Sequence, residues 1–347
     1  MTALNDLNNA IENLPSTARA AYDHERFPKK SQGILCAALL QPAATVVIVL
    51  LMLLLGEDYA SHFRTPFGAD MFSAILSELG LILPICLIVL TVSKKDIVST
   101  LRLSKSIDIA QILLLVFLCL FGFYSAQIIN ASFITGLEDV FGKAADINDQ
   151  FSPGNIGQLL FQIVVVGGLP AICEEILCRG IVLRSFERSS RVSAVIFSAL
   201  VFSLMHGNAQ QFLYAFICGI ALGAVAVISD SIYASITMHF TLNSMATLLT
   251  YEPIQVAFEQ FTTRVPLVFG LLLIVFDILT VVCFFLFLKY TQQKNVRLYG
   301  KKVPSDMAYP KLMPKQEIPD KIVYAISWII FVSLNIFSAV GLWKGIA

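Results

Sequence analysis

Charge is scarce in this sequence. Only 14% of its 347 residues are Asp, Glu, Lys or Arg, whereas 57% are hydrophobic and the mean hydropathy is +0.77. A chain with so little charge is too apolar for an ordinary soluble domain, and its composition is typical of a polytopic membrane protein. The formal net charge is zero, and nothing in the composition points to nucleic acid as a partner.

Three patterns that mark familiar sites are also missing. The seven cysteines all fall in apolar stretches and form no C-x-x-C pair, so neither a disulfide framework nor a cysteine zinc site is predicted. The sequence has no G-x-S-x-G turn, which a serine hydrolase of the α/β type would show. It also lacks H-E-x-x-H, the helix of the common zinc proteases.

Long hydrophobic runs are the dominant feature that is present. We predict an all-α, polytopic membrane protein with about nine transmembrane helices, because each of these runs is long enough, or nearly so, to cross a bilayer. The predicted spans are 33–55, 71–92, 109–129, 156–182, 192–206, 211–228, 232–250, 266–288 and 322–343. They divide the chain into a cytosolic tail (1–32), N-terminal spans (33–155), a helical core (156–250) and C-terminal spans (251–347).

Basic residues gather in alternate connections between these spans. If the N-terminus is cytosolic, twenty of the 24 Lys and Arg residues fall on the cytosolic side, as the positive-inside rule requires. The largest group lies in residues 289–321, which contain four prolines. We therefore predict a cytosolic N-terminus and an extended basic linker over 289–321.

Two carboxylates and an arginine interrupt the fourth run. Charges inside a span are costly, so they usually face a protein interior or a wet cavity. Glu175 and Arg179 are four residues apart and can pair along one helix face. Glu174 lies about 100° around the helix from Glu175, so it has no such partner. Glu174 is therefore our candidate for chemistry, and Glu175 and Arg179 are candidates for its support.

Polar residues recur in two of the three runs that follow. Phe202 and His206 share one helix face, and so do His239 and Asn243, because each pair is spaced by four residues. Because these polar residues and Glu174 occur in neighbouring apolar runs, we predict that they form one shared polar site. A base and two donor groups suit peptide hydrolysis by activated water. A zinc site formed by Glu174, His206 and His239 is an alternative, although we expect no metal or other cofactor.

These motifs carry a family resemblance. Glu-Glu-x-x-x-Arg, Phe-x-x-x-His and His-x-x-x-Asn, in this order on separate helices, resemble the CPBP family of intramembrane glutamic endopeptidases, which includes type II CAAX prenyl endopeptidases and bacteriocin-processing enzymes. The resemblance makes 156–250 the catalytic core. It implies that Glu174 and His206 activate water and that His239 and Asn243 bind the oxyanion. It also implies a membrane-tethered or prenylated peptide substrate and a multi-pass protein of the cell membrane.

Other functions remain open at this point. A transporter or proton-relay protein would also use intramembrane acids and histidines, although we find no repeated halves. A family member without activity could serve as a scaffold. We expect Glu78 and Asp277, the other intramembrane acids, to be structural groups outside the hydrolytic site. The sequence indicates neither the physiological substrate nor the oligomeric state.

Overall fold

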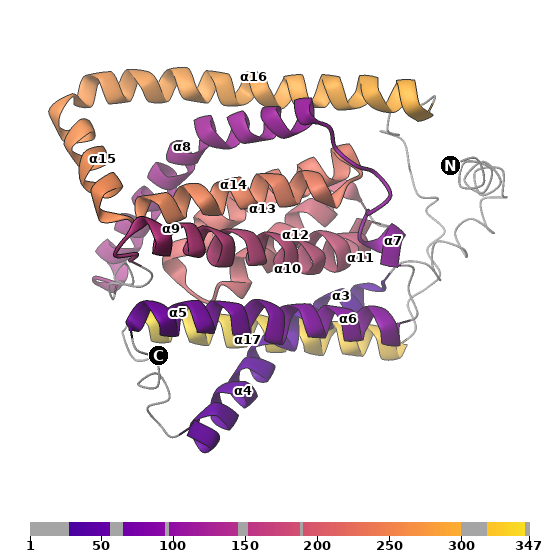
Figure 1. Cartoon of the computed structure of the whole chain (residues 1–347). Coiled ribbons are helices and arrows are strands. Elements are labelled where there is room, and N and C mark those ends of the chain that lie inside the picture. Colours follow the sequence, from indigo (N-terminus) through magenta and orange to yellow (C-terminus); the bar gives the residue numbers. More distant parts are fainter. Residues whose placement is uncertain are drawn as a thin grey trace.

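The structure of the chain is a computed structural model, and it is helical in every part that it describes (Figure 1). The described residues are 28–55, 65–93, 97–144, 152–187, 190–299 and 318–343. The cytosolic tail predicted for 1–32 lies outside the described residues up to residue 27, and Lys30 already belongs to the first described helix.

Eighteen consecutive elements make up the described fold, three of them π-helical segments labelled η. In chain order they are α3 (Lys30–Ala38), α4 (Leu40–Leu55), α5 (Pro66–Ile75), η2 (Leu76–Ile82), α6 (Leu83–Val92), α7 (Ile97–Thr100), α8 (Ile109–Phe141), α9 (Ile156–Gln162), η3 (Ile163–Gly168), α10 (Leu169–Glu175), η4 (Ile176–Val182), α11 (Leu183–Glu187), α12 (Arg191–Met205), α13 (Ala209–Ser229), α14 (Ile232–Leu249), α15 (Glu252–Arg264), α16 (Pro266–Tyr299) and α17 (Ile318–Trp343).

All nine predicted spans are helical, and the prediction of an all-α polytopic membrane protein is confirmed. Within the described ranges, seven helices are long and apolar enough to cross a membrane. The other two predicted spans are α12, which has only 15 residues, and α14, which has 18. His239 and Asn243 lower the hydropathy of α14. The two helices that fall short of the usual criteria therefore carry two of the three motifs.

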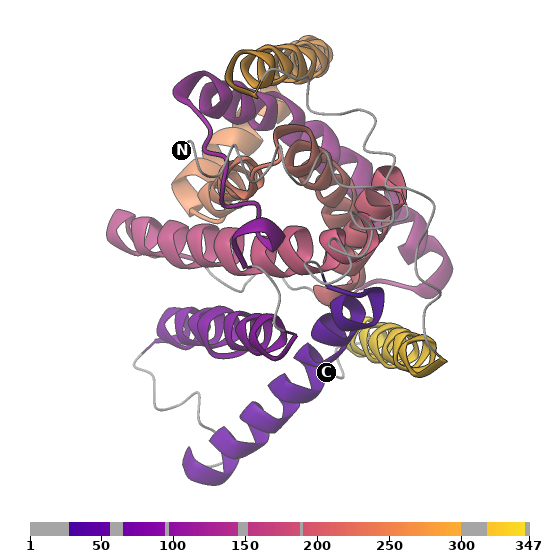
Figure 2. The ribbon, with the colours of Figure 1, turned by 90° about the vertical axis from the view of Figure 1, so that its right-hand side faces the viewer.

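The helices that carry the three motifs form the core of the bundle, and the remaining helices surround them (Figures 1 and 2). Helix α14 packs against α8 on one side and against α10 on the other, and α12 packs against α13. Helix α8 in turn packs against α16, while η2 packs against α10. The fourth span, α9 to α11, is consequently buried between the helices that follow it and the helices that precede it.

Irregular helix geometry is concentrated in the second and fourth spans. The three π-helical segments of the described chain are η2, η3 and η4, and the last two flank α10. Proline occupies the first turn of α6 and of α10. Because proline has no N–H to donate, each one removes a backbone hydrogen bond from its helix. π-helical segments often occur at functional sites, and here they surround Glu174 and Glu175.

Small residues bring α12 and α13 close together. A Cβ added at Gly219 would lie only 2.9 Å from the Cα of Ala199, which real Cβ atoms essentially never do. At Gly223 the nearest atom would be Cγ1 of Val195, at 3.2 Å. The G-x-x-x-G spacing thus allows a close helix crossing, which places the backbone of α13 within reach of side chains from the fourth span.

An ion network joins several helices at one end of the bundle. Arg102 donates to both carboxylate oxygens of Glu187 at 2.8 Å, and Arg184 bonds the same carboxylate at 3.0 Å. Asp230 pairs with Lys105 at 3.1 Å. Burial alone would raise the pKa of Asp230, but the cationic charges of Arg102, Arg184 and Lys105 outweigh this effect and lower it. The network fixes the ends of α11 and α13 to the loop before α8.

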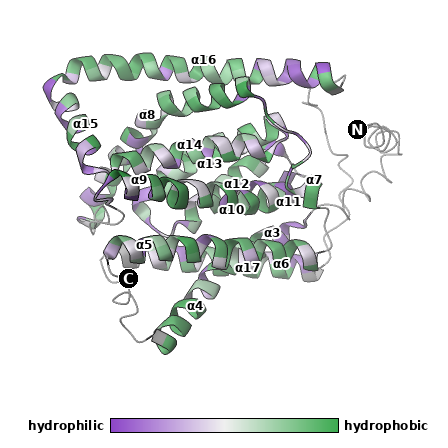
Figure 3. Ribbon diagram, in the orientation of Figure 1, coloured by the Kyte–Doolittle hydropathy of each residue, from purple (hydrophilic) through white to green (hydrophobic). Residues whose placement is uncertain are grey.

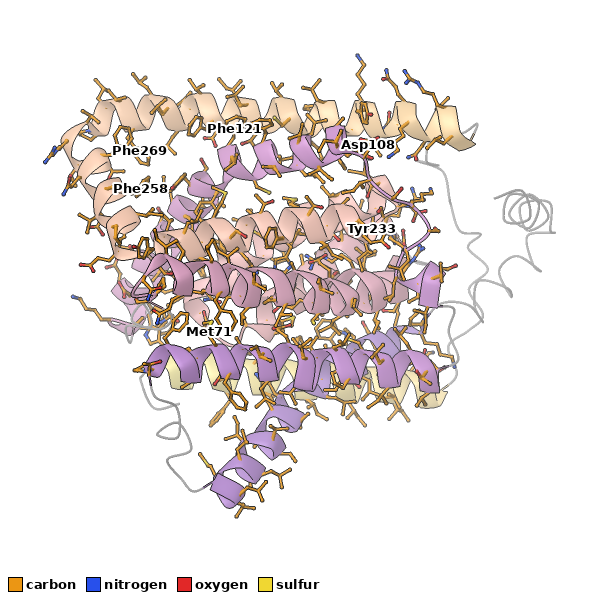
Figure 4. The ribbon with its side chains drawn as sticks, in the orientation of Figure 1. Met71, Asp108, Phe121, Tyr233, Phe258 and Phe269 are labelled. Atoms are coloured by element: carbon orange, nitrogen blue, oxygen red, sulfur yellow. The ribbon has the colours of Figure 1, made fainter. Side chains whose placement is uncertain are left out.

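Most helices of the bundle consist mainly of hydrophobic residues (Figure 3), and many of their large apolar side chains are exposed, as a lipid-facing surface requires. Polar residues are concentrated on α15 and at the last turns of α16. Aromatic rings join α15 to α16 and α16 to α8: the ring centroids of Phe258 and Phe269 lie 5.8 Å apart, and those of Phe121 and Phe276 lie 5.4 Å apart (Figure 4). The first three of these rings are labelled in the figure.

Two predicted boundaries are wrong. Helix α16 continues to Tyr299, so the first part of the linker 289–321 is helical rather than extended. Residues 300–317 of that linker lie outside the described residues. Helix α8 likewise continues to Phe141, beyond the predicted end of its span at 129. In both cases polar residues extend an apolar helix, which hydropathy alone does not detect.

Candidate functional site

Glu175 lies at the centre of the site. Its Oε1 accepts a hydrogen bond from Nη1 of Arg179 at 2.7 Å, so the predicted pairing along one helix face is confirmed. The same oxygen lies 2.9 Å from Nδ1 of His239. Glu175 and Arg179 have no solvent exposure, and His239 is 3% exposed. A buried carboxylate thus joins the fourth span to α14.

Arg179 is held by two further contacts. Its Nη2 donates to the carbonyl oxygen of Gly219 at 3.1 Å, a bond that depends on the close approach of α13. Its guanidinium carbon lies 4.6 Å from the ring centroid of Phe202, a distance at which the cation is attracted to the ring face. The arginine therefore connects the fourth span to α12 and α13 through Nη2 and its planar face, while its buried Nε has no hydrogen-bond partner.

Glu174 differs from its neighbour in exposure and in partners. Its side chain is 13% exposed, whereas the side chain of Glu175 is completely buried. Its Oε2 lies 3.8 Å from Nε2 of His239, beyond direct hydrogen-bond distance. Glu174 is therefore the carboxylate of the pair that a water molecule or a substrate could reach.

Phe202 separates the two histidines. Its ring centroid lies 5.0 Å from that of His206 and 5.4 Å from that of His239, with edge-to-face geometry in both cases. Nδ1 of His206 lies 2.7 Å from the carbonyl oxygen of Phe202. A carbonyl only accepts, so Nδ1 carries the hydrogen. In the neutral imidazole, Nε2 of His206 is consequently the basic nitrogen.

Asn243 is positioned by a feature of the fourth span. Its Nδ2 donates to the carbonyl oxygen of Val166 at 3.3 Å. Pro170, four residues after Val166, has no N–H to offer this carbonyl. The proline thus removes one backbone donor, and Asn243 supplies another. An amide group has two N–H donors, so Asn243 retains one for a ligand.

The tautomer of His239 follows in the same way. Because a carboxylate accepts, Nδ1 of His239 donates to Glu175. Nε2 can then donate only if the ring is a doubly protonated imidazolium. Two carboxylates and one arginine, with an imidazolium, form a cluster of zero net charge. A neutral cluster is the favourable arrangement in an apolar interior, and it would direct Nε2–H of His239 towards the side of Glu174.

The zinc alternative can be compared with this arrangement. In the part of the chain that the structure describes, no three side chains of His, Cys, Asp or Glu are arranged to hold a metal ion. Nδ1 of His239 is engaged with Glu175 and Nδ1 of His206 with a carbonyl, which leaves Nε2 of each ring as the nitrogen that could bind a ligand. As placed, the described residues do not bring these nitrogens and a carboxylate together as three ligands of one ion.

The structure brings the predicted residues together to different degrees. Ion pairs and ring contacts link five of them: Glu174, Glu175, Arg179, Phe202 and His239. His206 joins them through Phe202, and Asn243 lies on the same helix as His239 and contacts the fourth span. Asp277 is bonded to Ser125 at 2.6 Å, between α16 and α8, and takes no part in this group.

Glu78 is the acid whose position sequence reasoning misjudged. Its helix segment η2 packs against α10, and its carboxyl interacts electrostatically with Glu174. It therefore neighbours the site instead of lying apart from it. The presence of an acid within a span was a signal, but helix spacing connects residues only within one helix, and Glu78 lies 96 positions before Glu174.

Comparison with known proteins gives one match, which covers the part of the chain that carries the motifs. No curated protein and no solved structure was found to match the chain. A family model does match, over residues 156–245, and its description is type II CAAX prenyl endopeptidase Rce1-like. The matched region begins with α9 and contains all three motifs. Residues 156–245 are thus similar to the type II CAAX prenyl endopeptidases, and this match supports the resemblance to the CPBP family.

Proposed function

We propose that this multi-pass membrane protein is an intramembrane endopeptidase, which hydrolyses a peptide bond of a membrane-associated, CAAX-type substrate. The observation that carries the proposal is the convergence of Glu174, Glu175, Arg179, Phe202 and His239 from three helices within the region of family similarity. The carboxylate of Glu174, which is 13% exposed and lies 3.8 Å from Nε2 of His239, provides a base at a position that a peptide could reach.

Glu174 is assigned the role of base. Its carboxylate takes a proton from a water molecule while the water oxygen bonds to the peptide carbonyl carbon. Nε2 of His206, the basic nitrogen of that ring, accepts a second hydrogen bond from the same water. When the C–N bond breaks, the proton on Glu174 passes to the leaving amine nitrogen, and the carboxylate is restored for the next turnover.

His239 and Asn243 are assigned to the oxyanion. Negative charge develops on the carbonyl oxygen as water attacks, and donors held in place stabilise it. The imidazolium of His239 offers Nε2–H, and Asn243 offers its second amide N–H. Glu175 orients the ring of His239, since it accepts from Nδ1 at 2.9 Å. Glu175 therefore supports the chemistry through His239 as well as pairing with Arg179.

The position of the site suits a substrate that is anchored in the bilayer. Glu174 is about 15 Å along its helix from Arg184, on the usual rise of about 1.5 Å per residue, and Arg184 belongs to the ion network at the predicted cytosolic end. A peptide tethered by a lipid group would reach this depth without leaving the membrane. Free soluble peptides would have to leave water to reach it.

Cleavage of defined peptides tests the proposed function. The purified protein in lipid vesicles would be given a farnesylated peptide ending in a CAAX sequence, the same peptide without the lipid, and a bacteriocin leader peptide. We expect cleavage of the farnesylated peptide, with the bond identified by mass spectrometry. Preference for the leader peptide would change the substrate class, and no cleavage of any of them would favour a scaffold or transport protein.

Metal removal separates the two mechanisms. We expect that dialysis against a strong chelator leaves the cleavage rate unchanged, because the described residues offer no three-ligand metal site. Elemental analysis of the dialysed protein provides the parallel measurement. Loss of activity together with one bound zinc per chain, and its recovery on adding zinc, would reverse the assignment of Glu174 as the base.

Orientation in the membrane is tested with a matched pair of cysteines. All seven native cysteines are buried, so they give a low background for labelling. Gln260 and Gln293 are both exposed: Gln260 lies on α15, which precedes the first turn of α16, and Gln293 lies near the other end of the long helix α16. In intact cells, we expect an impermeant reagent to label Gln260→Cys but to label Gln293→Cys only after permeabilisation. The reverse pattern would contradict a cytosolic N-terminus.

A further inference from the structure

Glu78 is a buried acid that the mechanism above does not use. It is 5% exposed, and its Oε2 is buried without a hydrogen-bond partner. Its helical segment η2 packs against α5, α6, α4 and α10. An unpaired polar group in such a place reduces the stability of the folded protein. Its presence therefore calls for a function that packing does not supply.

The surroundings of Glu78 determine its charge state. Segment η2 packs against α10, and two residues of α10, Glu174 and Cys173, are close enough to Glu78 to interact with it electrostatically. Among the other helices that pack on η2, α4 contains no charged residue, α6 contributes Cys86, and α5 contains Asp70. None of these neighbouring elements offers a cation. Two adjacent carboxylates in a low-dielectric interior do not both remain ionised, and Glu174 is the more accessible of the two.

We propose that Glu78 is a positioning residue of the site: a neutral carboxylic acid on η2 that donates a hydrogen bond to the Glu174 carboxylate, directly or through one water molecule. The proposal rests on the proposed role of Glu174 as base. Glu174 has no cation partner within hydrogen-bond distance, since His239 lies 3.8 Å away. A hydrogen-bond donor on η2, which packs against α10, would hold the Glu174 carboxylate in the orientation that accepts a proton from water.

The irregular helices agree with this role. Glu78 lies on a π-helical segment, and Glu174 lies on the short α-helix between two others. A π-helical segment turns the side chains that follow it away from their regular α-helical direction. In the described chain these segments occur only in the two spans that carry these acids, so both helices depart from regular geometry close to the acids.

Two substitutions of Glu78 distinguish positioning from packing. Glu78→Leu removes the unpaired polar group, so we expect the melting temperature to rise, by about 2–4 °C. We also expect kcat to fall roughly tenfold or more, with KM unchanged, because Glu174 loses its donor. Glu78→Gln is neutral and retains a donor, so it should preserve most of the wild-type kcat. Both variants would be assayed with the farnesylated peptide.

A matched control is available on α8. Asn130 is also buried in a span, but it is fully engaged: it donates to the carbonyl of Gln210 at 2.7 Å and accepts from the backbone N–H of Tyr214 at 3.0 Å. Asn130→Leu should therefore lower the melting temperature and leave kcat of the folded enzyme unchanged. This is the opposite of the pattern expected for Glu78→Leu.

The outcomes separate this proposal from the proposed function. The positioning role is overturned if Glu78→Leu retains wild-type kcat, or if it is destabilised like Asn130→Leu. Equal losses of kcat in the Leu and Gln variants would overturn the neutral-donor role, because Gln keeps a hydrogen-bond donor that Leu lacks. If wild-type protein cleaves and Glu174→Gln does not, these results concern Glu78 alone. If wild-type protein cleaves nothing, the proposed function fails, and this role fails with it.

Discussion

Replacing Glu174 by Gln should lower kcat for the farnesylated peptide by a factor of roughly 10² or more, while the protein stays folded. Glutamine has almost the same shape but takes up no proton from water. Folding should be little affected because Glu174 is the less buried acid of the pair and forms no short ion pair: its distance to His239 is 3.8 Å. Cleavage rates and melting temperatures in detergent would be measured side by side.

An acid elsewhere in a span serves as the control for this variant. Asp277 on α16 is bonded to Ser125 and lies outside the site. Asp277→Asn should retain wild-type kcat, which would show that loss of an intramembrane charge does not by itself impair the enzyme. If Glu174→Gln cleaves at the wild-type rate, then Glu174 is not the base, whatever the effect of the control.

Replacing Glu175 by Gln should have the largest effect on stability. Arg179 then stays buried without the carboxylate that neutralises its charge. Breaking a buried ion pair in this way costs about 3–5 kcal/mol of folding free energy. The loss should appear as a lower melting temperature or poor recovery of folded protein. Turnover by the folded fraction should also fall, because the His239 imidazolium loses the carboxylate that accepts from its Nδ1 at 2.9 Å.

A double replacement tests whether the damage comes from the orphaned cation. In Glu175→Gln with Arg179→Met, no charge is left without its partner, so part of the lost stability should return. Arg179→Met alone should be destabilised as well, since Glu175 then remains as the unpaired charge. If Glu175→Gln is as stable as the wild type and the double variant is worse, the pair does not stabilise the fold as its geometry indicates.

Much of the fold and part of the site could be predicted from the sequence. Hydropathy predicted the nine helical segments, because burial in lipid requires long apolar runs. Spacing predicted the pairing of Glu175 with Arg179, because contacts within one helix repeat every three or four residues. These are local properties. The same reasoning missed the last turns of α16, where polar residues continue a helix that hydropathy predicts to end.

Contacts between helices were beyond prediction for a physical reason. The bond between Glu175 and His239 joins residues 64 positions apart, and helix periodicity places neither residue relative to the other. The same holds for Glu78 and Glu174. The contact of Asn243 with Val166 was partly foreseeable, since Pro170 indicated that the Val166 carbonyl had lost a donor. Which side chain would replace that donor depended on how α14 packs.

The position of Arg179 on the same helix as Glu175 has a consequence for how the protein is made. The middle of the fourth span, with Glu174, Glu175 and Arg179, can enter the bilayer with one ion pair already formed inside it, between residues four positions apart. Glu174 meets His239 only after α12, α13 and α14 have been synthesised and inserted. Glu174 is therefore the last of these acids to meet its neighbours, and the group of motif residues is complete only with the arrival of α14. Under the proposed function, a nascent chain would have a stable fourth span before it has a complete site, so it would not cleave substrates, or itself, while it is still being assembled.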